Sequence, residues 1–217
     1  LRALGTRLIE AEETERKRLA RELHDRVGQN LAVLGINLNI VRSLLPDETS
    51  STVFSRLDDS QALLEQTAQR TRDVMCDLRP PMLDDYGLTT ALRCYGEQLS
   101  SRSGLSISVN DGGRLPYLDQ AVENALFRIA QEALTNAVKH SQASEVMVTF
   151  AATAEKVSMT IADDGIGNNP AKVNVANVHR SWGLLIMAER AEALNGHCLV
   201  ESDPENGGTR IITEVRV

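Results

Sequence analysis

The sequence has few aromatic residues and no excess of positive charge. Phenylalanine, tryptophan and tyrosine make up 3% of the 217 residues, and the formal net charge is -7 at pH 7. Proteins that bind nucleic acids place basic surfaces against phosphates and aromatic rings against bases. This composition therefore argues against direct binding of DNA or RNA.

Cysteines are also scarce. The three that occur, Cys76, Cys94 and Cys198, lie far apart and form no CxxC pair. Such spacing is typical of neither a disulfide framework nor a thiolate metal site. We therefore expect this part of the protein to lie in the reducing cytoplasm.

The sequence lacks a hydrophobic run long enough to span a bilayer. Its most apolar stretch, residues 31–41, is interrupted by Asn37 and Asn39 and is shorter than the roughly 20 residues of a transmembrane helix. No signal-peptide pattern is present, and the chain opens on Leu1 inside a charged helical pattern that needs an upstream start. We expect a fragment of a longer protein.

What the sequence does contain changes in character near Arg79-Pro80-Pro81. Residues 1–79 hold 12 Lys and Arg, 13 Asp and Glu, and three of the 14 glycines, whereas residues 80–217 hold 11, 17 and the other eleven glycines. Proline and glycine mark breaks in regular structure. We therefore predict a helical domain over 1–79, a linker over 80–86 and a second domain over 87–217.

Two long amphipathic helices are predicted in the first domain. Apolar residues recur every three or four positions from Leu19 to Leu45, stop at Pro46, and recur again from Val53 to Leu78. A helix of about 45 residues is about 68 Å long, and two such helices cannot cover their apolar stripes on all sides. The expected fold is a hairpin that forms a dimeric four-helix bundle.

The second domain alternates helical and strand patterns, which predicts a two-layer α/β sandwich of the α+β class. Helices are expected over 87–101, 116–140 and 183–194, and strands over 105–109, 145–151, 156–162, 197–202 and 209–217.

The first candidate for chemistry is His24, at the edge of the first apolar stripe. A lone helical histidine is usually an ordinary surface residue. However, Asp25 follows it, and a carboxylate that engages one imidazole nitrogen leaves the other a better nucleophile. Gln29 lies four residues after Asp25, where its amide could orient a water. For Asp25 and Gln29 an ordinary solvated face is the alternative.

The long helix expected in the second domain carries a polar stripe with Glu132, Asn136, Lys139 and His140. Asparagine is a poor residue inside a helix because its side chain competes for the backbone. One reason for Asn136 is a side-chain oxygen for a hard cation such as Mg²⁺. The alternative is capping, since Lys139 and His140 stand where cations favour a helix C-terminus.

Asp163-Asp164-Gly165-Ile166-Gly167 follows the strand expected over 156–162. Glycines at 165 and 167 let the backbone approach a ligand, and Asp163 at the strand end offers an acceptor to an exocyclic amine. A calcium loop needs further oxygen ligands and a closing glutamate, which residues 168–170 do not supply. A plain turn is the other alternative.

Two further segments could bind anions. Residues 168–182 show no regular pattern, which is typical of a lid or a disordered segment, and Gly183-Leu184 then opens a helix whose start offers amides to an anion. Gly207-Gly208-Thr209 is a hairpin turn by default, and its amides could also cap a phosphate.

The order of these blocks resembles a known family. Residues 15–29, with Glu-Arg-x-Arg-x-Ala-Arg-Glu-Leu-His-Asp, resemble the phosphoacceptor box of two-component sensor histidine kinases of the nitrate-sensor (NarX/NarQ) and DesK-like subfamily. In the same subfamily, residues 78–88 are similar to the interdomain linker, 131–140 to the N box, 163–167 to the G1 box and 182–191 to the G2 region.

The resemblance implies a HisKA_3 dimerisation and phosphotransfer hairpin, followed by a GHKL (HATPase_c) ATP-binding domain with the Bergerat fold. His24 would accept the γ-phosphoryl group of ATP, with Asp25 as its base or orienting partner. Gln29 would place a water against the aspartyl phosphate of a response regulator.

The resemblance also implies roles in binding Mg-ATP. Asn136 would hold Mg²⁺ and Asp163 would receive the adenine amino group. The other nucleotide-binding residues implied are Glu132, Lys139, His140, Gly165, Gly167, Gly183, Leu184 and Thr209. The chain departs from many relatives in the second glycine box, where Ser181-Trp182-Gly183-Leu184 has one glycine, and at Ile186, where they have glycine.

The sequence therefore predicts the cytoplasmic catalytic core of a homodimeric sensor histidine kinase. It would phosphorylate His24 from Mg-ATP, pass the phosphoryl group to a receiver domain of a NarL/LuxR-type response regulator, and act as a phosphatase on that regulator. A segment upstream of Leu1 would anchor the whole protein in the bacterial membrane.

Two alternatives come from other functional classes. One is a degenerate module that dimerises and docks a regulator with an inactive ATP site, which the intact Asn136, Asp163, Gly165 and Gly167 argue against. The other is a GHKL-type ATPase or anti-sigma serine kinase without a phosphorylated histidine, which the His24-Asp25 pair argues against.

Overall fold

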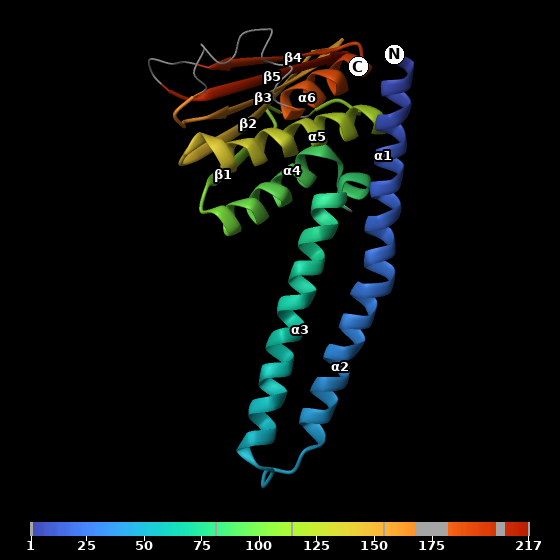
Figure 1. The fold of residues 1–217 in the computed structure, drawn as a ribbon, viewed down its shortest axis with the longest axis vertical. Helices are drawn as coiled ribbons and strands as arrows, with labels where there is room; N and C mark the ends of the chain where they lie inside the picture. The colour runs from blue at the N-terminus through green and yellow to red at the C-terminus, as the bar shows by residue number, and fades with distance from the viewer. Residues whose placement is uncertain are drawn as a thin grey trace. The chain divides into compact units, whose positions relative to one another are not determined.

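A computed structural model describes residues 2–80, 82–113, 115–153, 155–167, 182–202 and 207–216. The chain divides into two compact units, Leu1–Pro81 and Met82–Val217 (Figure 1). Among the helices that the structure describes, none combines the length and the apolar character needed to cross a bilayer.

The first unit is a helical hairpin, which confirms the prediction from apolar periodicity. One arm is continuous and comprises α1 (Arg2–Glu22), the π-helical segment η1 (Leu23–Gly28) and α2 (Gln29–Leu44). The other arm is α3 (Ser51–Leu78), whose start is capped by the Ser50 hydroxyl, which accepts a hydrogen bond from the amide of Thr52 at 3.3 Å.

Polar pairs join the two arms of the hairpin. Gln61 Nε2 donates to Asn39 Oδ1 at 2.6 Å, so one of the asparagines that interrupt the apolar run holds α2 to α3. Toward the other end, Arg79 Nη1 donates to Glu13 Oε1 at 2.7 Å. Each pair links a position on the first arm to a position at or near α3, and so contributes to the register between the arms.

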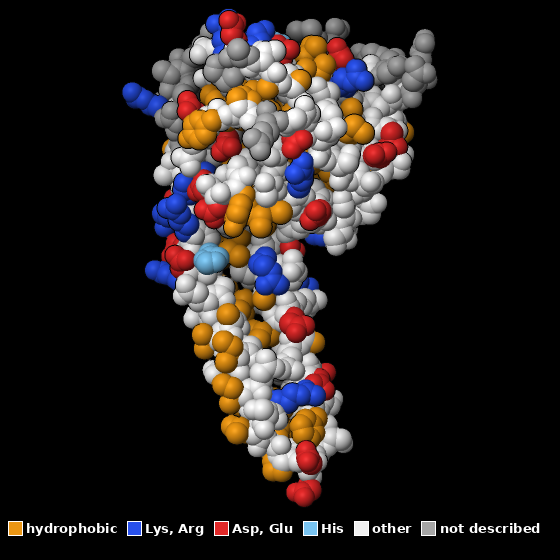
Figure 2. Space-filling view, turned by 180° about the vertical axis from the view of Figure 1, so that it is seen from behind, with side chains coloured by type: hydrophobic (Ala, Val, Ile, Leu, Met, Phe, Trp, Pro, Cys, Tyr) orange, Lys and Arg blue, Asp and Glu red, His pale blue; other side chains and the backbone are white. Residues whose placement is uncertain are grey.

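The hairpin leaves much of its apolar stripe uncovered. Figure 2 shows hydrophobic side chains along its length. The exposed large apolar residues of this unit include Leu19, Val27, Val33, Leu34, Ile36, Ile40, Val41, Leu44, Val53, Leu63 and Val74. An apolar surface of this extent is typical of an interaction site rather than of a solvated helix face.

The second unit is a two-layer α/β sandwich, as predicted. Its helices are α4 (Met82–Ser103), α5 (Gln120–Asn136) and α6 (Trp182–Ala193), with the π-helical segment η2 (Ala137–Ser141) at the end of α5. Its strands are β1 (Ser106–Asn110), β2 (Glu145–Ala152), β3 (Lys156–Asp163), β4 (His197–Ser202) and β5 (Thr209–Arg216).

These five strands form one sheet in the order β1-β2-β3-β5-β4. Strand β1 pairs parallel with β2, and the other neighbours are antiparallel. The last residue of β3, Asp163, pairs with the first residue of β5, Thr209, so the end of β3 and the start of β5 lie side by side at one end of the strands. The sheet therefore brings together, at this end of the strands, residues that lie far apart in the sequence.

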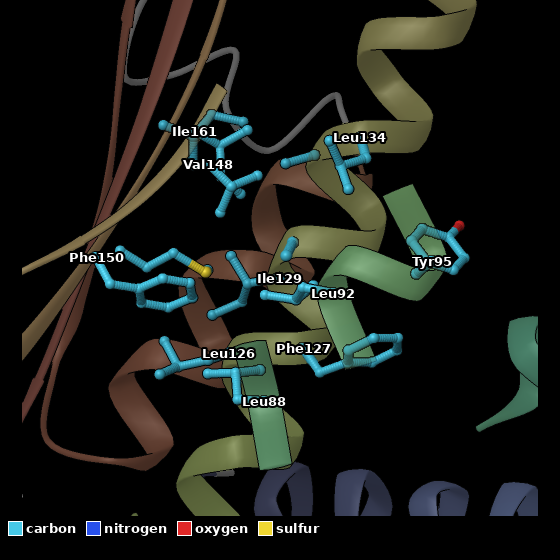
Figure 3. Close-up of a cluster of buried hydrophobic side chains, with 14 of the residues drawn as sticks. Leu88, Leu92, Tyr95, Leu126, Phe127, Ile129, Leu134, Val148, Phe150 and Ile161 are labelled. Carbon is cyan, nitrogen blue, oxygen red and sulfur yellow. The ribbon is translucent and has the colours of Figure 1, made fainter. Parts of the chain in front are cut away.

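The core lies between the sheet and the helices (Figure 3). Side chains alternate along each strand, so Val148 and Phe150 of β2 are buried against the helices, where Leu126 and Ile129 of α5 are also buried. Burying side chains of this size contributes about 1.5–3 kcal/mol each. The resulting packing holds α5 over β2 and β3, and so sets the position of the end of α5 relative to the end of β3.

Two helix starts differ from the predicted ones. Helix α4 begins at Met82, so part of the segment predicted as linker is helical, up to a break at Gly87 with φ 77°. Helix α5 begins at Gln120 rather than at residue 116, because Asp119 before it is extended, with ψ 146°. The apolar pattern that predicts these helices does not report backbone angles at their ends.

The π-helical segments were not predicted. A π turn inserts one residue into an α-helix without changing the apolar pattern much, and such turns are frequent at functional sites. Segment η1 contains His24 and Asp25, and η2 contains Lys139 and His140. Both segments thus fall on residues singled out by their chemistry.

Candidate functional site

His24 lies in η1 with its side chain 62% exposed. Its Nδ1 atom is 3.1 Å from Asp25 Oδ1. An ionised carboxylate can only accept a hydrogen bond, so this contact places the ring hydrogen on Nδ1 and leaves the lone pair on Nε2. The geometry therefore presents an exposed imidazole nitrogen that can act as a nucleophile.

Gln29 is the first residue of α2 and is exposed. No hydrogen bond joins its side chain to another residue in the described part of the chain. Because a π turn pairs residues five apart, η1 brings the direction of Gln29 closer to that of His24 than a regular α-helix would. Its exposed amide is therefore available to a water or a partner.

Several ion pairs lie close to His24 in the sequence, on α1 and η1. The Arg18 guanidinium pairs with Glu15 at 2.6 Å and with Glu22 at 3.3 Å, and Arg26 pairs with Glu22 at 2.9 Å. A hydrogen bond from Arg18 lowers the pKa of Glu15. The spacing of these pairs, three or four residues along the helix, is typical of pairs that stabilise a helix.

Asp163 is the last residue of β3 and is half-buried. Its Oδ1 atom accepts hydrogen bonds from the amides of Gly165 at 3.0 Å and Thr209 at 3.3 Å. Burial raises the pKa of Asp163, the two amides oppose this rise, and the charge of Asp164 adds to it. The Thr209 hydroxyl also lies beside this carboxylate and opposes the rise in pKa. No backbone amide of the described residues donates to Oδ2, which leaves that oxygen as an acceptor for a ligand.

Asp164 has different partners. Its Oδ1 atom accepts from the amides of Ser144 at 2.8 Å and Glu145 at 2.9 Å, and its Oδ2 atom accepts from the Ser144 hydroxyl at 2.5 Å. These hydrogen bonds lower the pKa of Asp164. Because its oxygens are used within the protein, the calcium-loop alternative loses one of its two aspartates.

The glycines after Asp163 bring backbone segments together. A Cβ atom on Gly165 would collide with the carbonyl oxygen of Ser141 in η2, and the amide of Ile166 donates to that oxygen at 2.8 Å. The Gly208 amide donates to the Gly165 carbonyl at 2.5 Å. Gly167 has φ 66°, a left-handed conformation that favours glycine. Gly165 is thus required because another backbone segment of the protein, at Ser141, lies close to it. The prediction had assigned this close approach to a ligand.

Glu132 and Asn136 lie one turn apart near the end of α5, and both are half-buried. Asn136 Nδ2 donates to Glu132 Oε1 at 3.3 Å. In this orientation the Asn136 side-chain oxygen has no donor among the described residues, so it fits the role of an oxygen ligand for a hard cation. The described residues contain no group of three or more His, Cys, Asp or Glu that could hold a metal.

The start of α6 lies against this pair. A Cβ atom on Gly183 would collide with Glu132 Oε1 and would lie 3.4 Å from Asn136 Nδ2. Leu184 follows, half-buried, in the first turn of α6. Gly183 was predicted as a candidate because it opens a helix. Its contact with Glu132 gives a further reason for glycine, since no side chain fits there.

Lys139 and His140 are exposed in η2, directly after Asn136. Segment η2 therefore lies between the Glu132 and Asn136 pair on one side and the Asp163 loop on the other, which it contacts through Ser141. The structure thus brings the predicted nucleotide-binding residues together around η2, β3 and α6. The predicted lid lies outside the described residues, except for Trp182, which begins α6.

A hollow of about 440 Å³ opens beside Asp163. It is lined by Ala162, Asp163, Glu201, Ser202, Gly207, Gly208, Thr209 and Arg210. This lining includes Asp163 and Thr209 but not Asn136.

Comparison with known protein families gives two matches along the chain. Residues 15–83 match the family described as Histidine kinase (HisKA_3). Residues 121–217 match the family described as Histidine kinase-, DNA gyrase B-, and HSP90-like ATPase (HATPase_c). The first match contains His24, and the second contains the residues around η2, β3 and α6.

Curated relatives resemble the chain over nearly its whole length. It is 31% identical over 211 residues to the signal transduction histidine-protein kinase/phosphatase DegS of Brevibacillus brevis, which covers 97% of this chain and 54% of that protein. It is 28% identical over 220 residues to the oxygen sensor histidine kinase NreB of Staphylococcus carnosus, covering 100% of this chain and 60% of that protein. The chain thus spans little more than half the length of these relatives.

A solved structure shares the fold. The histidine kinase domain of the Erythrobacter litoralis EL346 blue-light activated histidine kinase aligns with a TM-score of 0.51 and 16% identity. The alignment covers 85% of this chain and 95% of that one. At this level of identity the comparison establishes the fold alone.

Proposed function

We propose that this chain, which belongs to the histidine kinases that join a HisKA_3 domain to a HATPase_c domain, is the catalytic core of a two-component sensor kinase. Residues 1–79 form the phosphotransfer hairpin, 80–86 the linker and 87–217 the ATP-binding domain. The core phosphorylates His24 from ATP, transfers the phosphoryl group to an aspartate of a response regulator, and also dephosphorylates that regulator. The kinase/phosphatase DegS is a relative that supports both activities.

The contact between His24 and Asp25 carries the proposal. With the hydrogen on Nδ1, the His24 Nε2 lone pair attacks the γ-phosphorus of ATP, and the bond from that phosphorus to the β,γ-bridging oxygen breaks to release ADP. Positive charge develops on the ring, and Asp25 at 3.1 Å from Nδ1 stabilises it. The reaction needs positioning more than covalent assistance, as is usual for phosphoryl transfer.

The site in the second unit suits ATP. Asp163 is half-buried, and its Oδ2 oxygen, to which no described backbone amide donates, accepts the adenine amino group. The Asn136 oxygen holds Mg²⁺ beside Glu132, and Mg²⁺ neutralises charge on the phosphate oxygens when bound. The remaining residues proposed to contact the nucleotide are Lys139, His140, Gly165, Gly167, Gly183, Leu184 and Thr209.

The single glycine of the second glycine box is compatible with this site. Gly183 occupies the position where a side chain would strike Glu132, so the one glycine that is kept is the one that packing requires. Ile186, where many relatives have glycine, is 38% exposed and directs part of its side chain to solvent.

The proposed partners follow from the hairpin. Its exposed apolar stripe pairs with that of a second copy in a four-helix bundle, because association would bury this surface. The exposed His24 docks the receiver domain of a response regulator, which we propose to be of the NarL/LuxR type. The core acts in the cytoplasm, and a segment upstream of Leu1 anchors the whole protein in the membrane.

Labelling with ATP tests this function. The purified chain is incubated with γ-labelled ATP, with Mg²⁺ or with a chelator, and the label is then tested in acid and in base. Label that is acid-labile, base-stable and dependent on Mg²⁺ is expected. Acid-stable label would instead favour a serine kinase, release of free phosphate without label an ATPase, and ATP binding without either an inactive docking module.

Replacing Gln29 by alanine is expected to slow dephosphorylation of the regulator and to leave labelling of His24 unchanged. Gln29 is exposed at the start of α2, where it orients the attacking water. Loss of a positioned catalytic side chain lowers a reaction rate by about 10²–10⁴-fold. The measurement compares loss of label from the regulator with the rate of autophosphorylation. Equal losses in both would mean that Gln29 supports the helix instead. The matched control is Gln66→Ala, at another exposed helical glutamine, on α3.

Nucleotide affinity is expected to fall on acidification, beginning at a higher pH than for an ordinary aspartate. The raised pKa of Asp163 means that its carboxylate takes up a proton early and then loses its acceptor role. Neighbouring charges are Asp164, which raises this pKa, and Glu201 and Arg210, which line the same hollow.

The effect of Asp163 on folding stability has the opposite sign. Because the folded state binds this proton more tightly than the unfolded state, its contribution to stability falls as the pH rises from the unfolded pKa through the folded pKa. Calorimetric titration with ADP at a series of pH values, with thermal unfolding at each, separates the two effects. An ADP affinity that does not change with pH would exclude an ionised Asp163 as the adenine acceptor.

A further inference from the structure

The segment that follows β3 is tied to the segment that precedes β2, and Asp164 makes most of the ties. Its carboxylate accepts three hydrogen bonds from Ser144 and Glu145, at 2.5–2.9 Å. The Asp164 amide also donates to the Glu145 carbonyl at 3.3 Å. We call these three residues the Asp164 clamp.

The clamp continues into η2. Beside it, the Ile166 amide donates to the Ser141 carbonyl at 2.8 Å, and Gly165 lies so close to that carbonyl that it has no room for a side chain. Ser141 is itself buried, and its hydroxyl donates to the Ala137 carbonyl at 2.7 Å. Together, the clamp and this backbone contact join the loop that begins at Asp163 to the last turn of the helix that carries Lys139 and His140.

The two sides of the clamp carry the two ends of the proposed nucleotide site. Asp163, on one side, is the acceptor for the base, and Lys139 and His140, on the other, face the phosphates. One ribose joins the base of a nucleotide to its phosphates and limits the distance between them, so binding depends on the distance between Asp163 and η2. Local hydrogen bonds that hold this distance before binding lower the cost of ordering the site.

Asp164 itself is not available to the ligand. Its Oδ1 atom serves two amides and its Oδ2 atom a hydroxyl, and its pKa is lowered by these bonds. Asp164 is also exposed, so water can solvate the freed amides when its side chain is removed. The fold should therefore tolerate its loss better than the site does.

We propose that Asp164 is a positioning residue for nucleotide recognition, which fixes Asp163 relative to η2 and thereby sets the preference for adenine over guanine nucleotides. This inference rests on the proposed ATP site. Guanine carries an oxygen where adenine carries its amino group, so a well-placed carboxylate at Asp163 favours adenine and rejects guanine. A displaced Asp163 discriminates less.

Two substitutions separate the hydrogen bonds of Asp164 from its charge. Asp164→Ala removes all the side-chain bonds, whereas Asp164→Asn keeps an oxygen that can accept from the amides of Ser144 and Glu145. Asp111→Ala is the matched control, because it breaks an exposed pair with Arg93 (3.1 Å) and follows the end of β1 that lies away from the clamp.

The experiment measures the affinities of the whole chain for Mg-ADP and Mg-GDP by calorimetry, with thermal unfolding of each variant. Asp164→Ala is expected to weaken ADP binding about tenfold, from the loss of hydrogen bonds to a charged group. It should also lower the ratio of ADP to GDP affinity, while Asp164→Asn and Asp111→Ala stay within about twofold of the unmodified chain.

Several outcomes would overturn the inference. An unchanged ADP to GDP ratio in Asp164→Ala, whether ADP binding is normal or both nucleotides weaken equally, would give Asp164 only a structural role or none. An Asp164→Asn variant as weak as Asp164→Ala would show that charge, not the clamp, matters. If the unmodified chain binds no ADP, the proposed function fails first, and this result is distinct from a failure of Asp164.

Discussion

Replacing His24 by glutamine is expected to abolish phosphorylation of the chain while leaving ADP binding unchanged. Glutamine is polar and suits an exposed helical position, so the hairpin should keep its fold. It offers no nitrogen with a free lone pair, so no phosphoryl group can be accepted. The residues proposed to bind the nucleotide all lie in the other compact unit. The label from γ-labelled ATP should fall to background.

The control for this substitution is another exposed histidine. His197 is 64% exposed on β4 and lies 3.8 Å from Glu214, a histidine beside a carboxylate but outside η1. His197→Gln should keep full labelling. Acid-labile label that persists in His24→Gln would point to a second acceptor, and His140 would be the next residue to replace. Loss of ADP binding together with the label would contradict the assignment of the two functions to separate domains.

The elements of the fold were predictable from the sequence because they depend on local periodicity. The apolar stripe that stops at Pro46 marks the hairpin, and the alternation of strand and helix patterns marks the sandwich. The buried faces of the helices also follow the predicted pattern, since Leu126 and Ile129 of the predicted apolar face are buried. The first and last residues of the helices were less predictable, because backbone angles at a helix end depend on neighbours in space, as they do at Asp119 before α5.

The residues of the proposed site stand out in the sequence, whereas the hydrogen bonds among them and their neighbours do not. Asp163 stands out because it follows a strand and precedes glycines, whereas nothing in the sequence distinguishes what Asp164 beside it binds. Its partners Ser144 and Glu145 lie about twenty positions earlier and meet it only because β2 and β3 are antiparallel neighbours. Contacts between distant segments of this kind leave no periodic trace in the sequence.

The glycines illustrate the same limit. Gly183 is recognisable as the opening of a helix, but its contact with Glu132 joins α6 to α5 across about fifty positions. Gly165 is recognisable as part of a turn, but the atom that requires it is a carbonyl in η2. In both cases the sequence indicates the residue type, and the reason for it lies in tertiary packing.

The last prediction concerns Asp163, where asparagine is expected to reverse the preference of the site between adenine and guanine nucleotides. The amides of Gly165 and Thr209 both donate to Oδ1, so an asparagine must keep its oxygen there. Its amide nitrogen then replaces Oδ2. That nitrogen is a donor, and it faces the adenine amino group, which is also a donor.

The size of the effect follows from the hydrogen bond that is lost. A hydrogen bond to a charged group contributes about 1.5–3 kcal/mol, which corresponds to a loss of about tenfold to a hundredfold in ADP affinity. The same amide nitrogen can donate to the oxygen of guanine, so GDP affinity should not fall and the ratio of the two should invert. Because the loop keeps its hydrogen bonds to Oδ1, thermal unfolding of the free chain should change little.

Calorimetric titration of Asp163→Asn with Mg-ADP and Mg-GDP checks this prediction, with Asp111→Asn as the control for loss of one negative charge in the same unit. Equal weakening of both nucleotides would mean that the substitution disturbs the loop rather than the base contact. Normal ADP binding would remove Asp163 from the site altogether. An inverted preference would instead locate the base at Oδ2, because only at that atom does the substitution exchange an acceptor for a donor.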